Sequence, residues 1–167
     1  MRRSNINRLR SSCFALIPAF LLLLASCGNS STQVVDVSLA PAPYSLEVPP
    51  NIAERLIIEN MESDLANDFS AQARAAGALA QVYIKYKADD GIRHGFAGVY
   101  YFTKADFEKA QNPNEPPPYG SKVIEANGMV LAIAGPQDSI FEPSSQDGKN
   151  SMALYKLIYD AKSFKSS

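Results

Sequence analysis

A short apolar segment near the N-terminus decides which part of this chain can fold as a globular domain. Four arginines and no acidic residue precede it, and residues 14–25 are apolar apart from the turn-former Pro18. Twelve residues in a helix extend roughly 18 Å, whereas the hydrocarbon core of a bilayer is about 30 Å thick. The segment is therefore too short to span a membrane, and it is typical of an export signal that is removed from the mature protein.

The apolar segment ends in the run Leu24-Ala25-Ser26-Cys27. Small residues before the cysteine let a peptidase approach the backbone, and the thiol of Cys27 is available for acylation. The run resembles the lipobox of bacterial lipoproteins, which implies cleavage before Cys27, a lipid such as palmitate on this residue, and attachment to the extracytoplasmic face of the cell membrane. Gly28 stands where lipoproteins kept at the inner membrane often have Asp, so in a two-membrane cell the expected location is the outer membrane.

The mature chain expected from this cleavage, Cys27 to Ser167, has 141 residues, which suits one domain with a single core. It contains 17 acidic and 12 basic residues, a net charge of −5. A mildly acidic chain without a basic stripe is unsuited to binding nucleic acid. Beyond Cys27 there is no cysteine, which excludes cysteine nucleophiles, thiolate zinc sites and iron–sulfur clusters, and we expect no cofactor.

The expected mature chain divides into a tether and a folded domain. Polar and small residues after Cys27 predict that residues 27–42 form a flexible tether, stiffened at its end by Pro41 and Pro43. Three valines between positions 34 and 37 leave open a short edge strand within it. A single extracytoplasmic domain is expected over residues 43–167.

The domain alternates between strand-like and helix-like patterns. Strands are expected over residues 44–48, 56–58, 81–87, 95–102, 122–126 and 129–134. Asn127-Gly128 predicts a type I′ hairpin turn between the last two, because that turn needs positive φ at both positions. Helices are expected over residues 63–80, 103–111 and 151–164. The patterns together predict an α+β fold, with a mostly antiparallel sheet of five or six strands, a long C-terminal helix and one or two shorter helices.

Few residues in the sequence are candidates for catalysis. His94 is the only histidine in the sequence. It is either a general base or metal ligand that acts with Asp89 and Asp90, or an exposed loop residue. We favour the exposed loop residue, because the spacing of His94 and the two aspartates fits no metal site. Glu125 and Asp138 are the candidates for a catalytic carboxylate pair. The alternative is that Glu125 is a solvent-facing acid on a strand and that Asp138 is a turn residue. We predict no catalytic residue and no metal site.

Aromatic residues are more prominent than catalytic ones. Tyrosines and phenylalanines crowd the two expected strands 81–87 and 95–102, and strand alternation must send them to both faces of the sheet. One face should pack under helices, and the other could remain exposed for binding, since exposed tyrosine is typical of surfaces that contact sugars or peptides. Tyr83, Tyr86 and Tyr101 are the candidate binding surface; the alternative is that the helix over residues 63–80 covers this face.

Several short motifs between Pro43 and Phe164 resemble a family of small exported or lipid-anchored domains found mainly in Gram-positive bacteria. They are Tyr44-Ser45-Leu46-Glu47-Val48-Pro49, Gly95-Phe96, Thr103-Lys104-Ala105-Asp106-Phe107, Tyr119-Gly120, Asn127-Gly128-Met129-Val130, Gly135-Pro136-Gln137-Asp138 and Ser163-Phe164-Lys165. The family usually has Pro-Thr-Asp where this chain has Pro136-Gln137-Asp138. The resemblance implies a fold and a location, and it implies no catalytic residue because the family has no assigned activity.

The function expected from the sequence is that of a lipid-anchored extracytoplasmic module, not an enzyme, that binds a cell-wall component, a peptide or an envelope protein. One alternative is a surface hydrolase that uses carboxylates, and another is an accessory subunit of a membrane transporter or sensor. An enzyme should have a deep pocket with several convergent polar groups. A binding module should instead have an exposed aromatic patch or groove.

Overall fold

The computed structural model describes residues 33–61 and 68–167 of the chain. The chain divides into two units, Met1–Ser30 and Ser31–Ser167, of which the first lies outside the described residues. The candidate lipid carrier Cys27 and the expected export signal lie in that first unit. In the described residues no helix is both long enough and apolar enough to cross a membrane.

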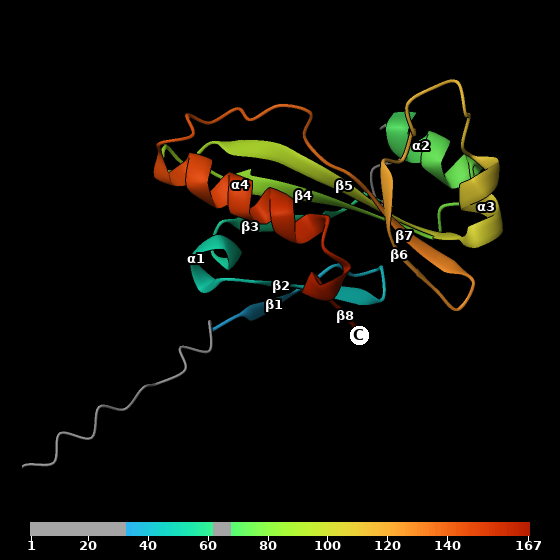
Figure 1. The fold of residues 1–167 in the computed structure, drawn as a ribbon, viewed down its shortest axis with the longest axis horizontal. Coiled ribbons are helices and arrows are strands. Elements are labelled where there is room, and N and C mark those ends of the chain that lie inside the picture. The colour runs from blue at the N-terminus through green and yellow to red at the C-terminus, as the bar shows by residue number, and fades with distance from the viewer. Residues whose placement is uncertain (1–32, 62–67) are drawn as a thin grey trace, which may run out of the picture. The chain divides into compact units, whose positions relative to one another are not determined.

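Two antiparallel sheets and four helices make up the described part of the chain (Figure 1). In chain order they are β1 (Val35–Ser38), β2 (Tyr44–Val48), α1 (Pro50–Ala53), β3 (Leu56–Asn60), α2 (Asp68–Ala75), β4 (Ala80–Lys87), β5 (Arg93–Thr103), α3 (Lys104–Lys109), β6 (Ser121–Ala126), β7 (Met129–Ala134), α4 (Gln146–Ile158) and β8 (Phe164–Ser166). One sheet has the order β3-β4-β5-β7-β6 and the other the order β1-β2-β8. The expected α+β class, with an antiparallel sheet of five strands and a C-terminal helix, is confirmed; the second sheet is an addition that the sequence pattern did not predict.

The five-stranded sheet is built around β5, whose eleven residues include buried Phe96, Val99 and Phe102. The neighbouring β4 alternates as its sequence predicts, with Val82, Ile84 and Tyr86 buried on one face. At the other end of the sheet, the turn between β6 and β7 has φ of 52° at Asn127 and 74° at Gly128. Positive φ at both positions confirms the expected type I′ geometry.

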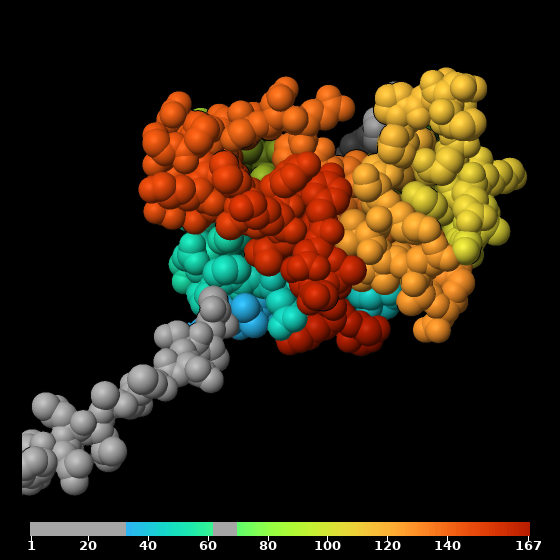
Figure 2. Space-filling view, viewed as in Figure 1, coloured from blue at the N-terminus to red at the C-terminus, as the bar shows by residue number. Residues whose placement is uncertain are grey.

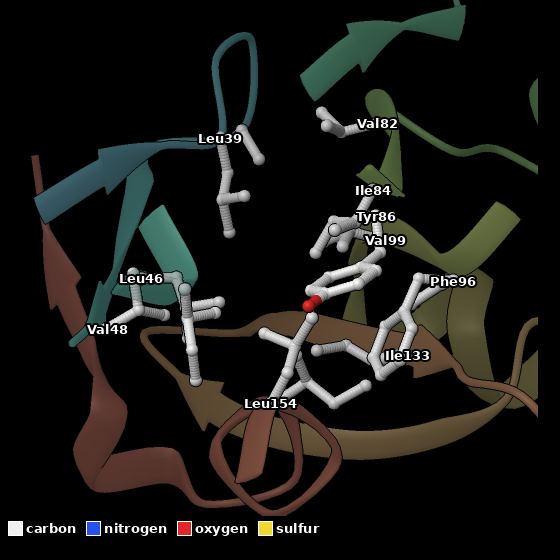
Figure 3. Close-up of a cluster of buried hydrophobic side chains, with 14 of the residues drawn as sticks. Leu39, Leu46, Val48, Val82, Ile84, Tyr86, Phe96, Val99, Ile133 and Leu154 are labelled. Carbon is white, nitrogen blue, oxygen red and sulfur yellow. The ribbon is translucent and has the colours of Figure 1, made fainter. Parts of the chain in front are cut away.

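The main core lies between one face of the five-stranded sheet, the three-stranded sheet and α4. Figure 3 shows the side chains that converge there from these three sources. They include Leu39, Leu46 and Val48 from the first two strands and the loop between them, Val82, Ile84, Tyr86, Phe96, Val99 and Ile133 from the large sheet, and Leu154 from the helix. Burying a side chain of this size stabilises the fold by roughly 1.5–3 kcal/mol relative to leaving it exposed. No cysteine follows Cys27, so the described part of the chain relies on such burial and not on disulfides.

A second, smaller core lies on the opposite face of the sheet, under α2 and α3. It contains Ala73, Tyr100, Phe102, Phe107, Tyr119, Val130 and Ala132. Figure 1 shows these two helices together near the β6–β7 end, away from α4. The helix α3 begins as predicted, because the side chain of Thr103 accepts a hydrogen bond from the backbone N–H of Asp106. Helices therefore cover both faces of the sheet, each over a different part of it.

The predicted boundary between tether and domain is wrong. Residues 35–38 form β1, which pairs with β2 from Val35 opposite Val48 to Ser38 opposite Ser45. The next residue, Leu39, is fully buried, and Ala42 is 4% exposed. The valines thus form the edge strand that the sequence left open, because the three-stranded sheet supplies an apolar surface for the chain to pack against. The folded domain begins near residue 35, eight residues earlier than predicted.

The C-terminal helix begins and ends earlier than predicted. It begins at Gln146 because Ser145 caps it, with its hydroxyl accepting from the N–H of Gly148 at 2.9 Å. It ends at Ile158, and the chain continues through a 3-10 turn, Ala161–Ser163, into β8. A cap set in a polar loop and a three-residue strand that exists only by pairing with β2 give little periodic signal in the sequence.

The helix expected over residues 63–80 is present in part. Within that range α2 covers Asp68–Ala75, and residues 62–67 lie outside the described residues. Leu79, placed on the helix stripe by its spacing, is 55% exposed and follows the helix. Gly77, with φ of 95°, ends the turn after α2 and explains the early stop.

Candidate functional site

The helix α4 presents apolar residues on two sides. Leu154 and Ile158 are fully buried and pack into the main core. Met152 and Tyr155, three residues apart on the same helix, point away from that core and are 50% and 46% exposed. Residues three apart are neighbours on a helix surface, so these two side chains form a second, unburied apolar stripe.

A loop between β7 and α4 lies opposite this stripe. It leaves the sheet at Gly135, whose N–H donates to the hydroxyl of Tyr159 at 2.9 Å, and Pro136 follows. Phe141 fixes the far part of the loop, because its ring packs edge-on against Tyr86 at 5.5 Å and against His94 at 5.1 Å between centroids. Two aromatic contacts thus hold the loop on the sheet while residues between Pro136 and Phe141 stay clear of it.

A hollow of about 250 Å³ lies between the loop, the helix and the start of β5. Its lining consists of Gly95, Phe96, Pro136, Gln137, Asp138, Ser139, Ile140, Phe141, Ser151, Met152 and Tyr155, and we call it the α4 groove. In Figure 2 it opens above the red-orange helix, framed by the orange loop, with yellow-green atoms of the sheet visible at its floor. The groove is therefore reached directly from solvent.

Exposed apolar side chains are concentrated at this groove. Ile140 is 60% exposed, and it joins Met152 and Tyr155 at the rim. The floor is formed by Phe96, which is 6% exposed, and Asp138 is the one charged residue in the lining. Contiguous exposed apolar surface rimmed by polar residues is typical of interaction sites.

The two serine hydroxyls of the groove bond to backbone carbonyl groups. The hydroxyl of Ser151 donates to the carbonyl of Gly148 at 3.0 Å, and that of Ser139 donates to the carbonyl of Phe141 at 3.0 Å. Both hydroxyls are therefore engaged with backbone groups, and neither has a basic side chain as its hydrogen-bond partner. A nucleophile needs an adjacent base to be activated, and neither serine has one among its hydrogen-bond partners in the described residues.

A buried polar network beside the groove holds the first turn of α4. The hydroxyl of Tyr86 donates to Oδ1 of Asp147 at 2.9 Å and accepts from the amide of Asn150 at 3.2 Å. Arg55 pairs with Asp89 and lies 3.7 Å from Asp147, linking the helix to β3 and β4. Burial raises the pKa of Tyr86 above its ordinary value, with the bond to Asp147 acting in the same direction and that from Asn150 opposing it. The network fixes one wall of the groove.

The three tyrosines predicted as a binding surface do not lie together. Tyr86 is fully buried in the main core, so its place in that surface is wrong (Figure 3). Tyr101 is half-buried on the same face of the sheet, where its ring packs edge-on against Tyr44 at 6.0 Å and joins the two sheets. Successive side chains of a strand point to opposite faces of the sheet, so a strand that exposes one residue buries the residues next to it.

Tyr83 lies on the opposite face from Tyr86 and Tyr101. Its hydroxyl covers Gly95 so closely that a β-carbon there would lie 2.0 Å from it. With Ser70, Gln81 and Tyr100 it lines a second hollow, whose wall also includes Met61, next in sequence to residues outside the described part. Tyr83 and Tyr101 are both partly exposed, and of the three predicted tyrosines it is Tyr83 that lines this hollow.

The other candidates from the sequence also lie apart. His94 is in β5, half-buried against Phe141, and is not the exposed loop residue that we favoured. Glu125 forms ion pairs with Lys104 and Lys122 at the hairpin end of β7, whereas Asp138 follows the other end of that strand. The four residue steps from Val130 to Ala134 alone span roughly 13 Å, so these carboxylates do not form a catalytic pair.

Sequence reasoning named Asp138, although for a carboxylate pair, and missed the apolar residues of the groove. A signal for two of these apolar residues was present. Met152 and Tyr155 are apolar but fall outside the buried stripe of Leu154 and Ile158. Apolar residues on the expected polar face of an amphipathic helix indicate a second contact surface. Phe96 and Phe141 had no such signal, because a bulge in β5 and a loop of irregular backbone place them.

Metal and family information add no further assignment. Across residues 33–61 and 68–167, no group of three or more His, Cys, Asp or Glu side chains could hold a metal ion. Comparisons of the chain with protein-family models, with curated proteins and with solved structures find no match.

Proposed function

We propose that this protein is a lipid-anchored extracytoplasmic binding module that holds an apolar part of a partner in the α4 groove. The observation that carries the proposal is the exposure of Ile140, Met152 and Tyr155 around one hollow. Each of these side chains is about half exposed, so it forgoes roughly half of the 1.5–3 kcal/mol that full burial provides, and a bound partner would recover part of this loss. A partner peptide or envelope protein fits this surface better than a polar sugar chain, since the lining has one charged residue.

The size of the groove favours a side chain over a small molecule as its occupant. Pockets for drug-sized ligands and cofactors typically have about 300–1,000 Å³, and this groove has about 250 Å³. The groove has room for an aromatic or branched aliphatic side chain. The surrounding rim would then contact the neighbouring residues of the partner.

Lipidation of Cys27 is the proposed means of attachment. The test is metabolic labelling with a fatty acid, followed by mass spectrometry of the N-terminus. We expect the wild-type chain to begin with acylated Cys27, and Cys27→Ala to remain an unacylated precursor. A mature N-terminus that lacks both the lipid and Cys27 would contradict the proposal.

The early start of the domain limits the reach of such an anchor. Only seven residues, 28–34, separate Cys27 from β1. At about 3.5 Å per residue they extend at most about 25 Å, compared with about 50 Å for the tether predicted from sequence. The proposed module therefore works close to the membrane surface, where partners are other envelope proteins or their membrane-proximal segments.

Site-specific photocrosslinking in living cells tests the groove. The full-length chain is made with benzoylphenylalanine in place of Met152 or, as a control, of Leu79, which is similarly exposed but lies outside the groove. We expect crosslinked adducts from position 152 and none of the same mass from position 79. Adding Tyr155→Glu should abolish the adducts at 152, because a charge at the rim opposes apolar contact.

Two results would contradict the binding proposal. Identical adducts from positions 152 and 79 would show contact without a preferred surface. Adducts at 152 that persist undiminished with Tyr155→Glu would show that the groove does not determine the contact.

A further inference from the structure

The central strand β5 lacks a neighbour along half of one edge. On one side it pairs with β4 from Arg93, opposite Lys87, to Tyr101, opposite Ala80. On the other side it pairs with β7 only from Gly98 to Thr103. In the described part of the chain, no backbone hydrogen bond joins residues 93–97 to the loop that follows β7. Backbone groups without a strand partner on this side therefore lie in the interior of the sheet order. Arg93 and Gly95 are exposed at this edge, whereas Phe96 and Ala97 are 6% and 1% exposed.

The sequence explains why β7 stops short of its partner. The N–H of Gly135 is used by the hydroxyl of Tyr159, and Pro136 has no N–H to give to a ladder. From there the loop turns toward α4 and returns to the sheet only at Phe141, against His94. An extended β7 would pass beside Gly95 and Phe96, and the α4 groove lies next to these two residues.

A bulge places an apolar floor beside the open edge. The pairing of β4 and β5 shifts between Ile84 opposite Ala97 and Lys85 opposite Gly95, so Phe96 is an extra residue in β5. Bulges re-aim side chains, and here the ring of Phe96 lies in the core while it also lines the groove. Backbone groups and an apolar pocket thus occur together, which is the combination that strand addition uses.

We propose that the α4 groove binds an extended polypeptide segment of a partner as an added strand along Arg93–Ala97 of β5, antiparallel to it and in continuation of β7. This inference rests on the proposed binding function and specifies its occupant. One large apolar side chain of the segment enters the groove between Phe96, Met152 and Tyr155. Main-chain hydrogen bonds provide affinity, and the pocket selects the side chain.

The first experiment pans a display library of random heptapeptides against the compact unit Ser31–Ser167, which has its own core. We expect enriched peptides with apolar residues at every second position and no central proline, because strand side chains alternate and proline lacks the N–H. Enriched peptides with apolar residues three and four apart would indicate a helix and overturn the proposal. Failure to enrich any peptide would also overturn it.

The second experiment determines the binding mode of the enriched peptides. N-methylation of successive peptide amides should weaken binding roughly tenfold at every second position and little at the others, because alternate amides of an edge-paired strand point at its neighbour. Amide exchange of residues 93–97 should slow on binding, with cross-strand contacts between peptide and β5 in nuclear Overhauser spectra. The strand-addition proposal would be wrong if N-methylation weakened binding at no position, or if the peptide showed contacts with α4 alone.

Matched variants locate the site and separate the two proposals. Met152→Glu should weaken peptide binding roughly tenfold or more, and Leu79→Glu, with equal charge and similar exposure, should leave it unchanged. Equal affinity in all three proteins would place the peptide elsewhere and overturn the inference. If no peptide binds but crosslinking from position 152 persists in cells, the strand-addition proposal is wrong while the binding-module proposal is supported. If self-association of the protein slows amide exchange at residues 93–97, the occupant is a second copy of this chain and the proposal of a separate partner is wrong.

Discussion

Gly120 lies where the chain enters β6, in a backbone conformation with φ of 74°. A β-carbon at this position would lie 2.0 Å from the carbonyl oxygen of Ile133 on β7. We therefore expect Gly120→Ala to destabilise the domain by several kcal/mol, because it adds a backbone clash to a conformation that disfavours side chains. Urea unfolding of the Ser31–Ser167 unit measures the change.

Gly128 provides the matched control for that prediction. It has the same φ of 74° in the hairpin turn, but nothing lies within 4 Å of an added β-carbon. Gly128→Ala should therefore cost only the conformational term, about 1 kcal/mol. If both variants lost the same free energy of unfolding, the backbone around Gly120 would have moved away from β7 and the clash would have no energetic cost.

The carboxylate of Glu125 illustrates an exposed ion pair at the residue scale. Hydrogen bonds from Lys104 and Lys122 lower its pKa to about 2. A lowered pKa contributes stability above pH 4.5 that is lost as the pH falls toward 2, and exposure keeps this contribution small. Carboxyl chemical shifts followed by nuclear magnetic resonance should show the low pKa, and Lys104→Gln should raise it. An unchanged titration in that variant would contradict the assigned cause.

At the scale of elements, the position of α4 depends on the hydroxyl of Tyr86. Tyr86→Phe removes the donor to Asp147 and the acceptor for buried Asn150 without opening a large cavity. We expect a loss of about 1–3 kcal/mol, because buried polar groups are left without partners. The same change at Tyr100, which is buried and has no hydrogen bond to any of the described residues, should cost about 0.5 kcal/mol or less. Thermal unfolding of both variants compares them, and equal losses would argue against the network.

At the scale of the whole molecule, the tyrosines link stability to alkaline pH. Burial raises the pKa of Tyr44, Tyr86, Tyr100 and Tyr119 above the ordinary 10.0. A raised pKa means that the stabilisation is complete below pH 10 and is lost as the pH rises through the folded-state values. The free energy of unfolding should therefore fall above pH 10. Tyrosinate absorbance should show part of the eight tyrosines titrating late in the folded protein, and a single transition identical to that in urea would contradict this.

Local signals in the sequence determined much of the fold. Alternation along residues 81–87, the Asn127-Gly128 pair and the capping residue Thr103 each act over a few residues, so strand faces, the hairpin and the start of α3 could be predicted without knowing their neighbours. The apolar segment ending at Cys27 is likewise local, and its prediction of a lipid anchor stays a prediction.

Only the tertiary structure decided where the candidate site lies. Valines 34, 35 and 37 gave no answer alone, because β1 exists through pairing with β2. Tyr86, predicted as part of an exposed surface, is buried under α4, whereas Met152 is exposed at the rim of the groove, since burial depends on what packs against each face. The groove itself needs a strand that ends at Ala134, a bulge at Phe96 and a helix that begins at Gln146. Contacts between such distant segments leave no periodic mark in the sequence.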